Sequence, residues 1–479
     1  MAAHNTFDSK HGRKPAGSPH RIASFKSKMF TCLSLLAVVL TSCDDTKELT
    51  LSRAELLNPE TCRNCHVAQF NEWQKSMHAY AADDPLFLAM NARGQRETNG
   101  ELGDFCVQCH APMAVREGLT EDGLNLGSIP QEFKGVTCYF CHNVEAVEGT
   151  HNNPLALAND VTMRGAIRDP IKSQVHRSQY SELLDRESDA SADLCGSCHD
   201  IVAPTGAHIE RTYTEWQDSV FNTGQFNQTC GECHMPAETA LVANVPEAPL
   251  REKGRHSHLF PAVDIPITPW PGIDQLREAN NREHENAVAS KVCYNPQGNT
   301  IDVFLTNIGS GHNFPSGSAP DRRGWLELVA VTDGAVVFES GTNTEGIAIS
   351  ELDDPNLWNM RDFWERADGK EAHMFWEAET LVDSPLLPPA TTFDVTNPNF
   401  DHSVLRQYPL GAIGRPDEIT VQVRLRPFGF DIIDDLVSTG DASPDLKDAI
   451  ETFDYSGSRL VWTPALAGAD GCVDPPNAR

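Results

Sequence analysis

The sequence is short of positive charge. Its 479 residues include 38 Lys and Arg against 68 Asp and Glu, which gives a formal net charge of −30. Proteins that bind a phosphate backbone neutralise it with Lys and Arg, so this deficit argues against a nucleic-acid partner. The sequence also lacks an apolar run of about 20 residues, the length that a transmembrane helix requires. We therefore expect neither nucleic-acid binding nor a membrane-spanning helix.

The first 42 residues have the layout of an export signal. Basic side chains precede an apolar run, Phe30–Leu40, which is too short to cross a bilayer and has the length of a signal-peptide core. Leu40-Thr41-Ser42-Cys43 then resembles the bacterial lipobox, which implies cleavage before Cys43 and lipidation of that residue. A plain secretory signal with an incidental cysteine is the alternative. We expect a lipoprotein signal peptide over residues 1–42.

This signal predicts where the mature chain resides. It would be exported to the bacterial periplasm or the cell surface. Since no other segment is long and apolar enough to span a bilayer, the attachment to the inner or outer membrane would be through lipid alone.

Ten of the fourteen cysteines fall into five copies of one motif, C-x-x-C-H. This motif is the attachment signature of c-type haem: the two thiols bond the vinyl groups of one porphyrin, and the adjacent histidine becomes the proximal iron ligand. The attachment residues are Cys62, Cys65, Cys106, Cys109, Cys138, Cys141, Cys195, Cys198, Cys230 and Cys233. The proximal ligands are His66, His110, His142, His199 and His234. The sequence therefore predicts five covalently bound haem c groups, each with its iron.

Two other kinds of site use C-x-x-C elements. Pairs of such elements bind zinc, and a single element serves as the redox dithiol of some oxidoreductases. Zinc sites would use the motifs in pairs and leave one of the five without a partner. Neither alternative explains a histidine after every second cysteine, whereas haem attachment explains all five copies.

The other four cysteines fit an exported protein. Cys32 lies within the signal segment, and Cys43 is the candidate for lipidation. Cys293 and Cys472 remain, and thiols in an oxidising compartment tend to pair. A disulfide between these two residues is therefore possible.

Residues 43–270 carry all five motifs and show few periodic segments, as expected where haem supplies the core. We expect short helices around the motifs, for example near Val67–Ala82. The frame E-W-Q-x-S occurs twice, at Glu72–Ser76 and at Glu215–Ser219. Two positions after the frame stands His78 in one copy and Phe221 in the other. Phenylalanine cannot bind iron, so the copies are not functionally equivalent.

The pattern changes after a proline-rich boundary at 261–271. A polar stretch, 274–290, predicts a helix in a linker over 271–292. Residues 293–479 then alternate apolar and polar side chains, for example over Ile301–Leu305 and Ile419–Leu425, and Asp333-Gly334 is a strong hairpin signal. We predict a mixed α + β protein of several domains: a mostly helical and loop-rich multihaem domain followed by an antiparallel β-sandwich.

Residues that flank the motifs carry a resemblance to a known family. These residues are Trp73, Ser76, His78, Ala111, Pro112, Gly135–Thr137, Met235 and Pro236. Over residues 60–262 the chain resembles the multihaem cytochromes c related to hydroxylamine oxidoreductase, its tetrahaem electron acceptor and pentahaem nitrite reductase. Residues 293–341, with Gly311–Gly317 as their mark, resemble a β-domain often fused to such cytochromes. The catalytic tyrosine and lysine features of the enzymes in this group have no counterpart here, so the resemblance implies the architecture of a carrier.

The resemblance also implies which histidines bind iron from the distal side. His78, His176 and His258 stand at ligand positions of the family, and His256 is the alternative to His258. His151 and His208 are weaker candidates. We expect the remaining histidines to be surface residues, namely His284, His373 and His402.

His312 is a distal candidate of another kind, because it lies in the predicted β-domain. Gly309 and Gly311 precede it and would let the backbone approach a flat ring closely. As an iron ligand it would dock the β-domain onto a haem. The alternative is a role in stabilising its own loop.

Two functions fit these features. A haem with two histidine ligands carries electrons, whereas one with an open position binds and transforms a small molecule. We favour an electron-transfer cytochrome that exchanges electrons with redox partner proteins, such as other cytochromes or quinol-linked donors. The alternative is an oxidoreductase that acts on a small inorganic nitrogen or sulfur compound at one five-coordinate haem. With either function, the β-domain would also suit a scaffold for a partner protein.

Overall fold

The computed structural model describes residues 50–223, 227–342 and 344–475, so the predicted export signal and Cys43 lie outside the described residues. Residues Glu48–Arg479 form one compact unit. No helix among the described residues is long and apolar enough to cross a membrane.

Short helices joined by loops form the first part of this unit. They are α1 (Arg53–Leu57), α2 (Pro59–Cys62), α3 (Val67–Trp73), α4 (Met77–Tyr80), α5 (Pro85–Glu97), α6 (Val107–His110), α7 (Pro112–Arg116), α8 (Cys138–His142), α9 (Ala190–Gly196), α10 (Thr212–Gln217) and α11 (Cys230–His234). The 3₁₀ helices among them are η1 (Leu126–Ser128), η2 (Gln131–Phe133), η3 (Glu182–Leu184) and η4 (Val220–Asn222).

Two-stranded sheets lie between these helices. They pair β1 (Val144–Val147) with β2 (Leu155–Leu157), β3 (Thr162–Gly165) with β4 (Arg177–Tyr180), β5 (Ile201–Val202) with β6 (His208–Glu210), and β7 (Ala237–Leu241) with β8 (Leu250–His256). The β3–β4 pair is parallel and the others are antiparallel.

Longer strands form the second part, after α12 (Ile273–His284). One sheet has the order β16 (Val404–Pro409), β10 (Thr300–Asn307), β9 (Val288–Asn295), β19 (Cys472–Val473). The other has the order β12 (Ala335–Ser340), β11 (Arg323–Thr332), β17 (Glu418–Arg426), β18 (Phe453–Trp462), with β13 (Asn359–Met360) paired to β11. The further elements are η6 (Ile349–Glu351), β14 (Phe363–Glu365), η7 (Phe375–Glu377), β15 (Thr380–Asp383), α13 (Phe430–Ser438) and α14 (Leu446–Ala449).

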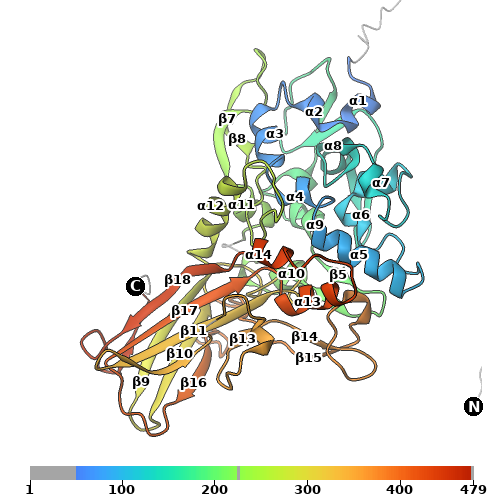
Figure 1. Cartoon of the computed structure of the whole chain (residues 1–479). Coiled ribbons are helices and arrows are strands. Elements are labelled where there is room, and N and C mark those ends of the chain that lie inside the picture. The colour runs from blue at the N-terminus through green and yellow to red at the C-terminus, as the bar shows by residue number, and fades with distance from the viewer. Residues whose placement is uncertain (1–49, 224–226, 343, 476–479) are drawn as a thin grey trace, which may run out of the picture. The chain divides into compact units, whose positions relative to one another are not determined.

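The helical part and the strand part, seen in Figure 1, differ in how they bury apolar side chains. Both larger sheets contribute to one large cluster of buried residues, in which Ile301, Leu326 and Val421 are 0% exposed. Among the helices the buried apolar residues form only small separate clusters. The strands therefore share one extended core of side chains, whereas the helical part has no core of comparable size among the described residues.

The alternation of apolar residues predicts the long strands correctly. Ile301–Leu305 lies in β10, Ile419–Leu425 lies in β17, and both strands turn their apolar face into the common cluster. Asp333 and Gly334 join β11 to β12 with φ values of 50° and 78°, the left-handed conformation that a two-residue hairpin turn requires. The mixed α + β class is confirmed.

Two predicted helices differ from the structure: one is divided in two, and the other ends early. The helix expected near Val67–Ala82 is divided into α3 and α4, because the Ser76 hydroxyl accepts a hydrogen bond from Ala79 N at 3.3 Å and starts a new helix. The helix expected over 274–290 ends at His284, and Val288 already begins β9. Val288 and Val292 are fully buried in the strand cluster, which favours the extended conformation there.

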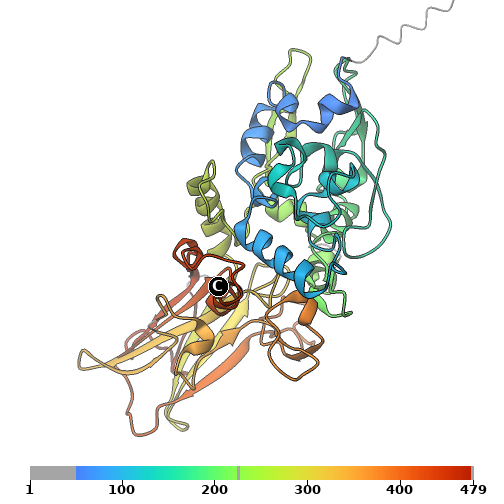
Figure 2. The ribbon, with the colours of Figure 1, turned by 45° about the vertical axis from the view of Figure 1, so that its right-hand side comes forward.

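A second apolar cluster joins the helical part to the strand part. Leu86, Ala89 and Met90 of α5 pack with Ile433 and Leu436 of α13. Figure 2 shows these two helices close together at the boundary between the parts. The two helices are far apart in the sequence, so this cluster packs the C-terminal part directly against the helical part.

A buried ion pair fixes the start of β11 to α13. The Arg323 side chain is 0% exposed and donates to Asp431 Oδ2 at 2.7 Å. Burial by itself would raise the pKa of Asp431, but the neighbouring Arg323 outweighs burial and lowers this pKa to about 2. The pair therefore stabilises the fold above the ordinary aspartate pKa of about 3.9 and loses its contribution as the pH falls toward 2.

We predict that Asp431→Asn lowers the free energy of unfolding by about 3–5 kcal/mol at pH 7, because it leaves the Arg323 charge buried and unpaired. The measurement is denaturant unfolding of the haem-loaded protein followed by circular dichroism. Glu278→Gln is the matched control, because the Glu278–Arg282 pair is exposed and should contribute less than about 1 kcal/mol. Equal losses in the two variants would contradict the prediction.

Candidate haem-binding site

Each C-x-x-C-H motif forms one helical turn. His66 N, His110 N and His199 N donate to the carbonyl of the first cysteine of their own motif, at 2.8, 3.3 and 3.0 Å. The third and fifth motifs form α8 and α11, and a threonine side chain caps each helix, Thr137 before α8 and Thr229 before α11. A turn of helix places residues three apart on one face, so both thiols of each motif point to the same side.

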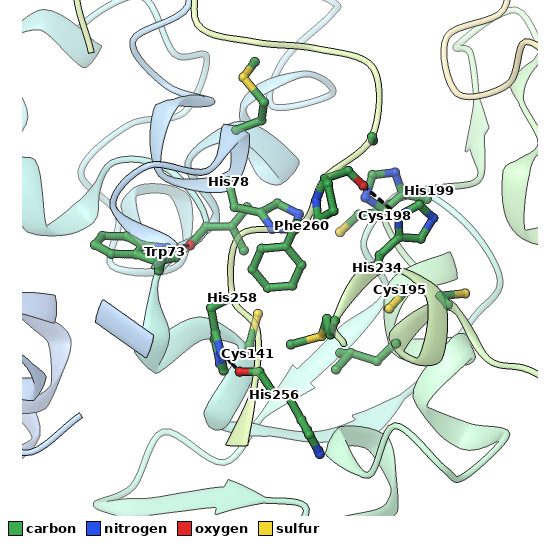
Figure 3. A pocket seen from close by; sticks show the side chains of 18 of the residues that line it. Trp73, His78, Cys141, Cys195, Cys198, His199, His234, His256, His258 and Phe260 are labelled. Atoms are coloured by element: carbon green, nitrogen blue, oxygen red, sulfur yellow. Dashed lines mark hydrogen bonds between the residues drawn. The ribbon is translucent and has the colours of Figure 1, made fainter. Parts of the chain in front are cut away.

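All five motifs face a single cavity. Its volume is about 1040 Å³, and its walls include the ten motif cysteines and the five motif histidines. His78, His176, His258 and His312 also line it. Figure 3 shows His78 and His258 against Phe260, with His199, His234, Cys141, Cys195 and Cys198 around them. The structure thus brings together every predicted attachment and proximal residue and the four main distal candidates.

The proximal imidazoles share one tautomer wherever their partner is a backbone carbonyl. Nδ1 of four of them lies within hydrogen-bonding distance of a backbone carbonyl: His66 with Val242 at 3.1 Å, His110 with Ala81 at 3.0 Å, His142 with Arg164 at 2.6 Å and His234 with Pro261 at 2.7 Å. A carbonyl oxygen only accepts, so Nδ1 is the donor. The lone pair of Nε2 is then free and directed at the cavity, as an iron ligand requires.

The fifth proximal imidazole has a charged partner. His199 Nδ1 lies 3.2 Å from the Glu210 carboxylate. Burial alone would lower the pKa of His199, but Glu210 outweighs it and raises this pKa to about 9. The fourth motif therefore differs from the other four in the electrostatics of its ligand.

Three motif imidazoles face a second imidazole across the cavity. The ring centroids of His66 and His176, of His78 and His199, and of His142 and His258 are each 6.3 Å apart. Metal–imidazole bonds are about 2 Å long, so two such bonds in line, with the ring radius added at each end, separate the centroids by about 6 Å. The centroid separation of each pair is therefore that of two imidazoles with one metal ion between them.

Burial keeps the distal imidazoles neutral. It lowers the pKa of His78 and of His258 to about 3, and that of His312 to about 4. The neutral imidazole is the form that binds a metal. His312 Nδ1 also donates to Asn313 O at 2.9 Å, which again frees Nε2.

His110 has different surroundings from the other motif histidines. Its ring stacks on Phe87 with centroids 4.0 Å apart and an interplanar angle of 3°. Within the described ranges, no imidazole ring is paired with it as the three rings above are paired. Among the described residues, His234 also has no imidazole paired with it in this way, so the stacking on Phe87 is what distinguishes His110.

The E-W-Q-x-S repeat has a structural role that the sequence did not reveal. Trp73 Nε1 donates to Val136 O at 2.7 Å, and Trp216 Nε1 donates to Gln228 O at 2.9 Å. Each of these carbonyls stands two residues before the first cysteine of a motif, the third in one copy and the fifth in the other. The repeated tryptophan therefore anchors the start of a haem-attachment helix in both copies.

The repeated glutamate holds a loop that carries a distal candidate. Glu72 Oε2 accepts a hydrogen bond from His258 N at 2.9 Å. Glu215 Oε2 accepts from Asn313 N at 3.2 Å and from the Ser316 hydroxyl at 2.6 Å, and Asn313 follows His312 directly. Both copies thus use one carboxylate to fix the backbone beside a cavity-lining histidine.

The motifs are also in contact with one another. Thiols of different motifs lie close to one another: Cys62 near Cys138, Cys109 near Cys198, and Cys195 near Cys230. Cys141 interacts electrostatically with both Cys195 and Cys198. The fourth motif therefore touches the second and fifth motifs and lies near the third, while the first touches the third.

The histidines with weaker or no predicted roles fall into three groups. His151 and His208 are exposed, with ring centroids 6.5 Å apart, and do not line the cavity. His256 lines the cavity, but the ring that faces His142 is that of His258. The expectation of a surface position is wrong for His284, which is 2% exposed and stacks on Tyr455, because α12 packs against β18.

His373 belongs to a network of ion pairs. Ligand atoms of Glu371, His373 and Asp431 lie within 4.8 Å of one another, a spacing that could suit a metal ion. However, Arg361 pairs with Glu371 and Arg323 pairs with Asp431. The carboxylates are therefore already neutralised, and we assign no metal to them.

Cys293 and Cys472 are joined by a disulfide that pairs β9 with β19. The ten motif cysteines are not in disulfides. The bond lies in the strand part, away from the residues that line the cavity.

Comparisons with known proteins agree with this geometry. Residues 61–143, which contain the first three motifs, match the family model for cytochrome c554 and c-prime. No curated protein matches the chain. The crystal structure of a penta-heme cytochrome c552 from Thermochromatium tepidum is similar at a TM-score of 0.58 and 17% identity, over 86% of this chain and 100% of that one. The chain has the fold of a multihaem c-type cytochrome.

The wall of the cavity also contains buried polar atoms that fit haem. Arg186 Nε, Arg322 Nε and the Ser191 hydroxyl are buried in its wall, and among the described residues they have no hydrogen-bond partner. Buried polar atoms of this kind normally find a partner. The two carboxylates that every haem carries are acceptors of the type these donors need, so the residues present fit the group.

Proposed function

We propose that the chain is an exported, lipid-anchored electron-transfer cytochrome with five haem c groups. The observation that carries this proposal is the set of imidazole pairs 6.3 Å apart, in a cavity that all ten motif cysteines line. When bound, haem iron supplies one-electron transfer, and two histidine ligands restrict it to that role. The thiol contacts between motifs would hold neighbouring haems side by side.

The residues of the chain contribute orientation and exclusion of water. The Nδ1 hydrogen bonds of the proximal histidines fix each ring and direct Nε2 to the iron position. Phe260, with its ring centroid 4.4 Å from that of His78, and the apolar side chains of the cavity wall would keep water from the irons. Little reorganisation would then accompany the arrival or loss of an electron.

Other parts of the proposal rest on the sequence. The likeness to the hydroxylamine oxidoreductase lineage supports a fused β-domain, and the common core of the two larger sheets supports a β-sandwich. We retain the domain boundaries 1–42, 43–270, 271–292 and 293–479, except that the β-domain starts at Val288, where β9 begins. A lipid on Cys43 would keep the protein at a membrane of the periplasm or the cell surface, where other cytochromes or quinol-linked donors would be its partners.

We propose that His312 is the distal ligand of the fifth motif, opposite His234. The two copies of the repeat support this pairing. Trp73 anchors the third motif and Glu72 holds His258, whose ring lies opposite His142 of that same motif. By the same relation, Trp216 anchors the fifth motif and Glu215 holds the loop of His312. His234 and His312 also lie within electrostatic range of each other.

The second candidate function is catalysis at the second motif. The stacking of His110 on Phe87, and the lack of an opposed imidazole among the described residues, favour an iron with an open position there. Such a haem would bind a small inorganic nitrogen or sulfur compound and exchange electrons with it.

Intact mass tests the number of haems. The mature protein, denatured and free of non-covalent ligands, should exceed its polypeptide mass by five haems and by the lipid on Cys43. In Cys43→Ala the five haems should remain while the lipid mass disappears and the signal segment is retained. Four haems in the fully matured protein would contradict the count, and lipidation of Cys43→Ala would contradict the anchor.

His312→Ala should convert one of the haems from low spin to high spin, because it removes one of the two ligands. Electron paramagnetic resonance of the oxidised protein measures this change. His208→Ala is the matched control, since His208 is exposed and does not line the cavity. A low-spin spectrum unchanged in His312→Ala would leave this residue as a loop-stabilising one.

Titration with nitrite, hydroxylamine or sulfite tests the second candidate. An open iron at the second motif should give a spectral shift with the amplitude of one haem. His110→Ala should remove this response and leave the spectra of the other haems in place. Spectra that none of the three compounds changes would count against catalysis on them.

A further inference from the structure

Glu210 is the charged partner of a proximal ligand. It ends β6, its side chain is 12% exposed, and its Oε1 atom lies 3.2 Å from His199 Nδ1. The other four proximal imidazoles donate to backbone carbonyls, which carry no net charge. Glu210 therefore distinguishes the fourth motif from its four counterparts.

A carboxylate on Nδ1 acts on the iron through the imidazole ring. It accepts the Nδ1 proton more strongly than a carbonyl does, and so makes Nε2 a more basic ligand. The oxidised iron carries one more positive charge than the reduced iron, and a basic ligand next to a negative charge stabilises the oxidised form. Glu210 is only 12% exposed, and a haem on His199 would cover the imidazole, so solvent and salt would screen this interaction only weakly.

The fourth motif lies next to several other motifs, so the potential of its haem would affect electron transfer among them. The fourth motif is linked to the second through Cys198 and Cys109, and to the fifth through Cys195 and Cys230. It also lies near the third through Cys141. A haem here would be the branch point of the set, next to the haems of the second and fifth motifs and near that of the third.

We propose that Glu210 is a positioning residue that lowers the reduction potential of the haem at Cys195 and Cys198, so that the branch point passes electrons on and does not retain them. One electron reduces the iron at each step, and no other bond changes. The inference rests on the proposed electron-transfer function and adds to it a residue that sets the potential of one haem. His78, whose ring faces His199, would be the distal ligand of the same haem.

The test is a redox titration of the haem-loaded Glu210→Gln variant, followed by absorbance and electron paramagnetic resonance. Glutamine keeps an oxygen that accepts the Nδ1 proton but removes the charge. The reduction potential of one haem should rise, those of the other four should stay, and the low-spin signals should persist. The haem that moves should be the one whose low-spin signal His78→Ala removes.

Two further variants complete the test. Glu187→Gln is the matched control, because Glu187 pairs with Lys253 at the surface and should shift no potential. Glu210→Asp retains the charge and should leave the potential below that of Glu210→Gln, even if glutamine disturbs the local fold. An unchanged titration in Glu210→Gln, or an equal shift of all five haems, would overturn the role of Glu210. A wild-type protein without five redox-active haems would instead overturn the proposed function.

Discussion

The architecture of residues 50–262 depends on an interior that side chains do not fill. Ten cysteines and at least nine imidazoles converge on one cavity, while the apolar residues around it form only small clusters. A polypeptide that wraps flat, rigid groups has no need of long helices or wide sheets. Short helical turns are sufficient when each is attached covalently to one haem. Most helices of this part are accordingly short.

The ligands in such an interior must be held from outside the ring. Hydrogen bonds on Nδ1 orient the proximal imidazoles, and the repeated Glu and Trp residues hold the loops and helices that carry them. Glu215 extends this scheme to the strand part, because its carboxylate binds the loop after His312. The larger sheets thereby contribute to the site, even though their own core lies elsewhere.

Features set by local chemistry were predictable from the sequence. Covalent attachment requires two thiols on one helical turn beside a histidine, and a hairpin requires residues such as Asp333 and Gly334 that accept positive φ. Features set by distant contacts were not. The partner of His199, Glu210, is an ordinary glutamate in the sequence, and the burial of His284 follows only from the packing of α12 on β18. The helix after 274 ends early because Val288 is recruited to the strand core.

Hydrogen exchange on a haem-free chain tests most directly whether haem is the core of the helical part. The chain would carry serine at all ten motif cysteines and be compared with the haem-loaded protein. If haem is the core, backbone amides of residues 60–262 should exchange as fast as in an unfolded chain, while β10, β11 and β17 stay protected by their own core. Protection of both parts in the haem-free chain would show that side chains alone hold the cavity, and would contradict the account.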